Sequence, residues 1–422
     1  MIDIPTAPGD KDGRVFLKGV ILLTVCGFIL RAWGLSSQQL SGDDIEVAVS
    51  AVRYMESGHL GTMWHHPELR NILVYASMSI SGGVWGLKSI SLILGSLSVP
   101  LLALTSRQII KHEGAALMAA FFLAVDPLHI DFSRQAVHEV YMMFFALLGI
   151  FLSLRFKDNP KPALLFMGCA GFGLGIASKW YVAFPMAITF LYLLYDTVKK
   201  PVSDGRLKRH TAVFLSVAFF AVPATVYLLT FIPWFQRGFT LSEWVALQLE
   251  MFREASTHRG NIPYTVELEH KAYLWFVKPV VFADFTYGKD GPGVLLGMGN
   301  PFVWLLTIPA LLYAGVEAVK KRHGRNCFLA GLFCFSYFPF VLAKRPIWVH
   351  SAFSVLPFAF MAIAYFLTDI AGSKPNRKRL LLFYLLMVTI AAVPLYILAV
   401  GKGFQIPLFK PLFELYRPSF EQ

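Results

Sequence analysis

Charged residues are scarce in this chain, and their scarcity argues against a soluble globular protein. Asp, Glu, Lys and Arg make up 15% of the 422 residues, whereas an average soluble domain carries about 25%. Hydrophobic residues account for 56% and aromatic residues for 15%. Such richness suits side chains that pack against acyl chains and gather at the level of the lipid headgroups. The composition therefore predicts a protein that resides in a lipid bilayer.

The sequence also has few cysteines and lacks nucleotide-binding motifs. The cysteines lie inside apolar runs, without a CxxC or a Cys/His spacing that would indicate zinc, and no Walker A or GxGxxG turn is present. The net charge of +12 is carried by short Lys/Arg clusters between apolar runs, not by a basic domain. We therefore expect membrane lipids and no nucleic acid as partners. The four cysteines are Cys26, Cys169, Cys327 and Cys334.

Eleven apolar runs approach the length that a membrane crossing requires. A helix needs about 20 apolar residues to cross the hydrocarbon core, and the third and fifth runs are short or Gly-rich. We expect an all-α polytopic bundle that forms a single domain over residues 1–422. Its crossings are predicted near 15–35, 84–106, 115–128, 139–156, 163–178, 180–197, 212–233, 297–318, 327–343, 350–371 and 380–400.

Lys and Arg clusters alternate with two long loops along the chain. Because short cytoplasmic connections are enriched in Lys and Arg, we place the N terminus and the basic connections in the cytoplasm. Residues 36–83 and 234–296 then form external loops that concentrate acids, histidines and aromatics, so chemistry is expected on that face. The basic connections lie near residues 107–111, 155–161, 199–209, 320–325 and 374–379.

The first external loop opens on a carboxylate pair, Asp43 and Asp44, followed by apolar residues at spacings of three and four. That period predicts an amphipathic helix lying on the membrane surface. The carboxylates have two interpretations: general acid–base chemistry, or capping of the first helical turn. Further on, the adjacent His65 and His66 lack an HExxH or comparable spacing, so the pattern does not favour a metal site.

Isolated charges stand at the outer ends of several predicted crossings. Ionisable residues at membrane depth are costly and are functional candidates by default. Arg134 and Glu139 lie in the segment SRQAVHE, Lys179 separates two apolar runs, and Arg345 follows Lys344. Snorkelling of the side chain to the interface is the alternative for Arg134. Basic patches that converge opposite an acidic pair suit an anionic phosphate ligand and a hydroxyl nucleophile.

The ordered set of motifs resembles the protein O-mannosyltransferase family of the GT-C superfamily, membrane glycosyltransferases that use polyprenyl-phosphate sugars. Asp43-Asp44 is similar to the family's Asp-Glu pair in the first external loop, and the segment HPEL at 66–69 is similar to its HPPL. The resemblance covers nearly the whole chain in the family's order. It continues in SRQAVHE at 133–139, GLGIASKW at 173–180, GNPFVW at 299–304 and KRPIWVH at 344–350.

Three departures from the family pattern concern the acceptor more than the chemistry. Asp44 stands where Glu is usual, Glu68 replaces a proline, and the second long loop follows the His- and Trp-rich pattern only loosely. The soluble beta-trefoil insert of the eukaryotic members is absent. The resemblance therefore implies a bacterial or archaeal enzyme of the cell membrane, with its active site on the external, periplasmic face.

The resemblance implies an inverting transfer of mannose or a similar hexose from a polyprenyl monophosphate to an acceptor hydroxyl. The lipid-linked donor is expected as a substrate, and the sequence leaves a requirement for a divalent metal open. The acceptor is a protein Ser or Thr, or alternatively a lipid or cell-envelope glycan. The implied roles are general base for Asp43, positioning for Asp44, phosphate binding for Arg134, Lys179 and Arg345, and further positioning for His66 and Glu139.

Two other classes compete with the transferase interpretation. A lipid-sugar transporter or flippase would place ionisable residues near the bilayer midplane on broken helices, whereas most of them here lie at predicted outer ends. A noncatalytic membrane subunit would tolerate loss of the carboxylate pair.

Overall fold

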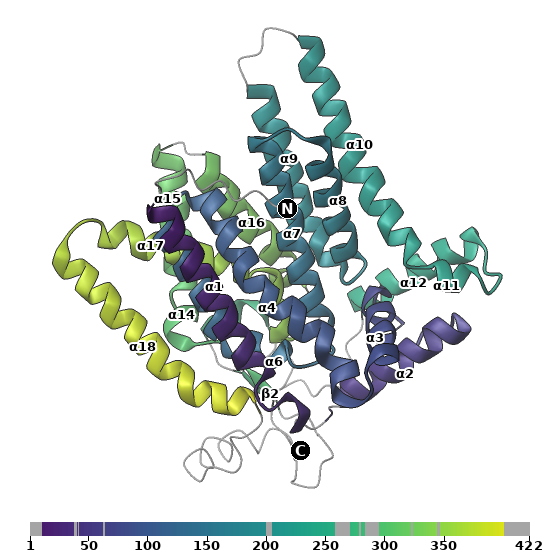
Figure 1. Ribbon diagram of the computed structural model, residues 1–422. Helices are drawn as coiled ribbons and strands as arrows, with labels where there is room; N and C mark the ends of the chain where they lie inside the picture. Colours follow the sequence, from purple (N-terminus) through teal and green to yellow (C-terminus); the bar gives the residue numbers. More distant parts are fainter. Residues whose placement is uncertain are drawn as a thin grey trace.

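The protein is, in a computed structural model, a bundle of α-helices with one pair of short strands (Figure 1). The helical architecture predicted from the apolar runs is confirmed. The described residues are 11–37, 40, 42–61, 64–199, 205–257, 271–277, 280–282, 295–321, 324–343 and 347–400.

Eleven helices coincide with the eleven predicted crossings. In the part of the chain that the structure describes, seven helical segments have the length and apolarity to cross a membrane. Three more are apolar but shorter, including the two predicted as short; how many helices cross stays a prediction. The eleven are α1 Lys11–Ala32, α4 Gly83–Ile110, α5 Glu113–Val125, α7 His138–Asp158, α8 Pro162–Ile176, α9 Ala183–Lys199, α10 Gly205–Leu229, α15 Thr307–Lys321, α16 Gly324–Val341, α17 Leu356–Ala371 and α18 Pro375–Ala399.

The remaining elements mostly lie between these eleven helices in the sequence. The amphipathic helix expected in the first loop is α2 Gly42–Ser57, and a second helix, α3 Leu69–Ile80, follows it. Strands β1 Val280–Phe282 and β2 Leu295–Gly297 pair antiparallel, a small addition to the all-α expectation. The others are α6 Pro127–Phe132, α11 Ile232–Phe235, α12 Leu241–Thr257, α14 Pro301–Trp304, η1 Leu35–Ser37, η2 Trp180–Val182, η3 Ala272–Leu274 and η4 Val349–Ser354.

Two short helices begin at a polar residue followed by proline. Asp126 accepts a hydrogen bond from the backbone N–H of His129 at 2.9 Å and starts α6, while Asn300 accepts one from Phe302 at 3.1 Å and starts α14. Proline suits the first helical position because its missing N–H would have no partner there. The indole N–H of Trp304 donates to Asp126 at 2.8 Å, so the two helix starts are tied together.

Close packing of α7 against α8 fixes the centre of the bundle. A Cβ atom on Gly149 would meet the ring of Phe172 at 2.6 Å, and one on Gly171 would meet the backbone nitrogen of Gly149 at 3.1 Å. Small residues that let two helices approach closely are typical of membrane bundles. Figure 1 shows α2, α3, α11 and α12 gathered at the end of the bundle opposite to the first turns of α10.

Candidate functional site

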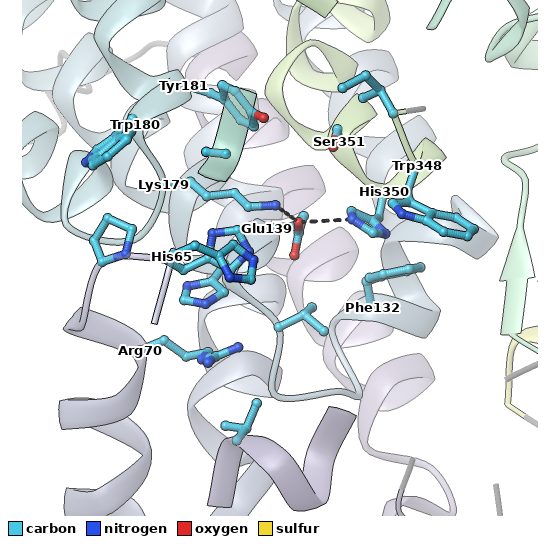
Figure 2. A pocket seen from close by; sticks show the side chains of 17 residues that line it. His65, Arg70, Phe132, Glu139, Lys179, Trp180, Tyr181, Trp348, His350 and Ser351 are labelled. Carbon is cyan, nitrogen blue, oxygen red and sulfur yellow. Dashed lines mark hydrogen bonds and ion pairs between the residues drawn. The ribbon is translucent and has the colours of Figure 1, made fainter. Parts of the chain in front are cut away.

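A cavity of about 290 Å³ lies where α2 and α3 meet the ends of the long helices. Its wall combines segments far apart in sequence, and Figure 2 shows their side chains around a common space. Eight of them are His, Lys, Arg, Glu or Ser and can bind a polar ligand. The lining residues are Val47, His65, His66, Pro67, Arg70, Phe132, Val137, His138, Glu139, Lys179, Trp180, Tyr181, Ala255, Ile347, Trp348, His350 and Ser351.

Glu139 is the charged centre of this cavity. The ammonium of Lys179 forms an ion pair with its Oε1 atom, and Nε2 of His350 lies 3.5 Å from the same oxygen. Lys179 and His350 approach the carboxylate from opposite sides (Figure 2). The side chains of Glu139 and Lys179 are only 5% and 9% exposed, and each supplies the counter-charge that the other requires in a buried site.

Local backbone structure explains why these side chains meet. Glu139 occupies the first turn of α7, where the helix dipole favours a negative charge. Lys179 follows the end of α8 in extended conformation, with φ −155° and ψ 134°. The backbone N–H of Leu69 donates to the carbonyl of Ala177 at 3.1 Å. This bond ties the start of α3 to the end of α8, and so brings the first loop to Lys179.

Three histidines in contact with one another form the wall between α3 and α7. The ring centroids of His65 and His66 are 4.2 Å apart, and those of His66 and His138 are 4.7 Å apart. Burial, followed by the positive charge of Lys179, lowers the pKa of His66 well below its ordinary value, so this ring is neutral at pH 7. Neither ring nitrogen of His138 has a hydrogen-bond partner among the described residues, which leaves both for a ligand.

Arg70 is a second cation of the cavity, and two neighbours hold its guanidinium. Its Nε and one NH2 group donate to Oδ1 of Asn71 at 3.3 and 3.1 Å. The Asn71 amide in turn donates to Oε2 of Glu68 at 2.6 Å. Burial raises the pKa of Glu68 to about 7, while the bond from Asn71 and the charge of Arg70 oppose the rise. Glu68 thus orients Arg70 through Asn71.

The charge balance of the lining favours an anion. Arg70 and Lys179 carry two positive charges and Glu139 carries one negative charge, so the described lining has a net charge of +1 when its histidines are neutral. Guanidinium and ammonium groups are the usual partners of phosphate. Among the residues that the structure describes, no three His, Cys, Asp or Glu side chains are grouped to hold a metal ion.

Of the predicted carboxylate pair, Asp44 is committed to the framework. Its Oδ2 atom lies 2.7 Å from Nζ of Lys88 in α4, and its Oδ1 accepts a hydrogen bond from the backbone of Ala136 at 3.1 Å. Asp44 is 1% exposed and does not line the cavity. Asp43 lies in the first turn of α2, one turn before the lining residue Val47; its side chain is outside the described part of the structure.

The three predicted phosphate ligands have different outcomes. Lys179 lines the cavity, together with the predicted positioning residues His66 and Glu139. Arg134 does not line it: this guanidinium is buried and donates to the carbonyls of Arg31 and Trp33, both at 2.7 Å. The geometry therefore gives Arg134 the role of holding the last turn of α1. Arg345 lies outside the described residues, so its role stays a prediction.

Several residues of the site were missed by sequence reasoning. Arg70 directly follows the segment HPEL and His350 ends the segment KRPIWVH, but only their neighbours were proposed as site residues. His138 precedes Glu139 at the start of an apolar run, and no motif in the sequence distinguished it as a site residue. Lys88 carried the clearest signal, since it is an ionisable residue inside a predicted crossing.

Comparison with known proteins finds relatives in sequence. The model of the family described as dolichyl-phosphate-mannose-protein mannosyltransferase matches residues 21–239. A polyprenol-phosphate-mannose–protein mannosyltransferase of Mycobacterium tuberculosis is 22% identical over 373 residues, which cover 72% of this chain and 70% of that protein. The family match includes the carboxylate pair and every cavity residue up to Tyr181.

Solved structures share the fold at low sequence identity. The Pmt1-Pmt2 protein O-mannosyltransferase complex of S. cerevisiae bound to the sugar donor matches with a TM-score of 0.77 and 12% identity, over 92% of this chain and 90% of that chain. The oligosaccharyltransferase of Archaeoglobus fulgidus matches with a TM-score of 0.57 and 15% identity. The match covers 92% of this chain but only 56% of the archaeal protein, which is longer.

Proposed function

This chain belongs to the dolichyl-phosphate-mannose-protein mannosyltransferase family, and from that membership we propose that it transfers mannose from a polyprenyl-phosphate donor to a hydroxyl group of a protein. The family match confirms the resemblance found in the ordered motifs. The protein is an integral membrane protein, as its apolar helices and its GT-C-like fold show. The mycobacterial relative is named for the same donor class and for a protein acceptor.

The observation that carries the proposal is the cationic cavity at one end of the bundle. Lys179 and Arg70 are placed to bind the phosphate of the donor, while the polyprenyl chain stays among the helices. Buried cations that face a leaving phosphate stabilise the charge that develops as the sugar departs. Glu139 keeps Lys179 and His350 in fixed positions, because both contact its Oε1 atom.

The transfer step needs one proton acceptor. The acceptor hydroxyl oxygen bonds to C1 of mannose, the bond from C1 to the phosphate oxygen breaks, and the phosphate leaves with the electron pair. Asp43 takes the hydroxyl proton as general base. Its position one turn before Val47, on a helix that borders the cavity, supports this role, and Asp44 anchors that helix through Lys88.

The histidines suit recognition of the sugar. A neutral imidazole both donates and accepts hydrogen bonds, which matches the hydroxyl groups of a hexose. His66 and His138 stand beside each other in the lining, and we assign them to the mannose hydroxyls. The N terminus faces the cytoplasm and the cavity opens on the external side of a prokaryotic cell membrane, an orientation supported by the basic connections on the opposite side.

Product analysis tests the proposed function. The purified full chain is incubated with polyprenyl-phosphate mannose, or with the matching glucose donor, and with a peptide rich in Ser and Thr or a membrane lipid extract. Mass spectrometry should find a peptide that has gained one hexose, only with the mannose donor. A product formed solely in the lipid extract would replace protein by a lipid or glycan acceptor, and no product from any donor would overturn the enzymatic proposal.

A further inference from the structure

Helix α18 lies at the periphery of the bundle, and few of its residues are fully buried. Only 11% of its apolar segment is buried inside the protein, whereas the corresponding values are 67% for α4 and 78% for α7. Figure 1 shows α18 tilted at the periphery. Two side-chain bonds attach it farther along: Tyr384 donates to the carbonyl of Phe302 at 2.8 Å, and Asn300 donates to the carbonyl of Val388 at 2.9 Å. The first turns of α18 lie outside these two contacts and form one side of a groove.

That groove lies between α17 and α18 and has a volume of about 780 Å³. This size falls within the range of about 300–1,000 Å³ that is typical of ligand pockets. Its wall is apolar over most of its length, so a hydrocarbon chain fits it better than a polar ligand. The side chains that define it are Leu367, Ile370 and Ala371 of α17 and Leu381, Tyr384 and Met387 of α18.

One end of the groove is basic. Arg377 is the charged residue of the lining and also donates to the carbonyl of Ile370 at 3.0 Å. Lys374, Lys378 and Arg379 are exposed beside it. The nearest acid in sequence, Asp369, accepts a hydrogen bond from Tyr313. Residues 369–379 thus hold four cations and one acid, a net charge of +3 at the mouth of an apolar groove.

We propose that this groove binds one anionic phospholipid of the membrane, with an acyl chain along α17 and α18 and the phosphate at Arg377 and Lys378. Basic pockets between membrane helices bind acidic headgroups in this way. The lining of Arg377 to Met387 spans ten residues, or about 15 Å of helix, long enough to hold much of an acyl chain. The charge complementarity favours an acidic lipid over a zwitterionic one.

The groove is separate from the cavity around Glu139. The two share no lining residue. The groove lies at the end of α17 that carries Asp369, whereas His350 precedes the other end, and the 16 residues of α17 span about 24 Å. A single donor phosphate therefore does not occupy both, and the inference does not depend on the proposed transferase activity.

Lipid binding to the purified full chain tests the proposal. Native mass spectrometry compares phosphatidylglycerol with phosphatidylcholine of the same acyl chains. We expect phosphatidylglycerol to remain bound and the zwitterionic lipid to be lost at least five times more readily. Leu381→Trp fills the groove and should abolish this preference, as should Arg377→Gln combined with Lys378→Gln. The matched controls are Leu382→Trp, on an exposed position outside the lining, and Lys161→Gln, in another basic connection.

The melting temperature in detergent identifies variants that fail to fold. If Leu381→Trp does not fold, Met387→Trp is used in its place to fill the groove. Equal retention of the two lipids by the wild-type chain would overturn the proposal. So would equal effects of Leu381→Trp and Leu382→Trp. If polyprenyl phosphate displaces phosphatidylglycerol and its binding is lost in Leu381→Trp, the groove belongs to the donor and the assignment to a membrane phospholipid is wrong.

Discussion

Asp44 of α2 and Lys88 of α4 form an ion pair of 2.7 Å between side chains that are 2% and 0% exposed. The pair joins the helix that carries the predicted base to the longest helix of the bundle. A buried pair broken on one side leaves an uncompensated charge, which costs about 3–5 kcal/mol. Of the two neighbouring aspartates, Asp44 therefore stabilises the fold, while Asp43 is the one proposed as the base.

Lys88→Met should lower the free energy of unfolding by about 3–5 kcal/mol, because it removes the buried counter-charge of Asp44. Unfolding in detergent, followed by circular dichroism, measures the loss. Adding Asp44→Asn to the same chain should restore part of it, since the buried charge is then removed. A double variant as unstable as the sum of the two single variants would contradict the pairing.

Asp43→Asn should reduce transfer about 100-fold or more at unchanged stability, because an amide does not accept the hydroxyl proton. Turnover is measured with excess donor and acceptor. Asp44→Asn should instead lower stability, since it leaves the ammonium of Lys88 without its buried counter-charge. Near-normal turnover of Asp43→Asn would move the base to another residue of the first loop.

Lys179→Met should weaken binding of polyprenyl phosphate about 10- to 100-fold, the loss expected for one hydrogen bond to a charged group. Isothermal titration of the purified protein gives the dissociation constant. Arg134→Met is the matched control, because Arg134 holds the carbonyls of Arg31 and Trp33. It should lower stability and leave the affinity of the folded protein unchanged; the reverse pattern would restore Arg134 as a phosphate ligand.

Glu68 should make the protein less stable as pH rises. Burial raises its pKa to about 7 in the fold, from an ordinary value of 4.5 for a glutamate, so the folded state binds more protons than the unfolded state between these values. Stability then falls between about pH 4.5 and 7 and levels off above pH 7. The melting temperature of Glu68→Gln should fall less over this range than that of wild type. The exposed Glu56→Gln should behave like wild type, and identical curves for all three would refute the shift.

The orientation can be tested by cysteine labelling in a variant without the four native cysteines. A membrane-impermeant maleimide should label Thr257→Cys from the external side and Lys161→Cys only after the membrane is opened, if the basic connections face the cytoplasm. Labelling of Lys161→Cys in intact cells would invert the proposed topology.

Local pattern was enough to predict the helices and part of the site. Runs of apolar residues predicted eleven helical segments, and isolated charges at their ends made Lys179 and Glu139 candidates, while the family resemblance added His66; all three line the cavity. These signals lie within a few residues of each other and need no knowledge of the fold. The confirmed family resemblance supplied the rest of the chemistry.

Long-range partners could not be predicted in the same way. Asp44 and Lys88 are 44 positions apart, and nothing in either segment states that they pair. Arg134 has the charge and placement expected of a phosphate ligand, yet its guanidinium reaches the carbonyls of Arg31 and Trp33. The sequence alone does not tell whether a charged side chain at a helix end binds a ligand or caps a helix, because the same donor and acceptor groups serve both roles.

The contact of Gly149 with Gly171 and Phe172 has a consequence for how this site can evolve. Gly149 lies ten residues, or about 15 Å of helix, from Glu139, and α8 leads from Gly171 to Lys179. The separation of the two charged groups is thus set by a helix crossing about 15 Å away from Glu139. A methyl group added at Gly149 would shift one end of the pair against the other. Substitutions at the crossing of α7 and α8 are therefore constrained by the geometry of the candidate site, and they should alter turnover without changing any residue that lines the cavity.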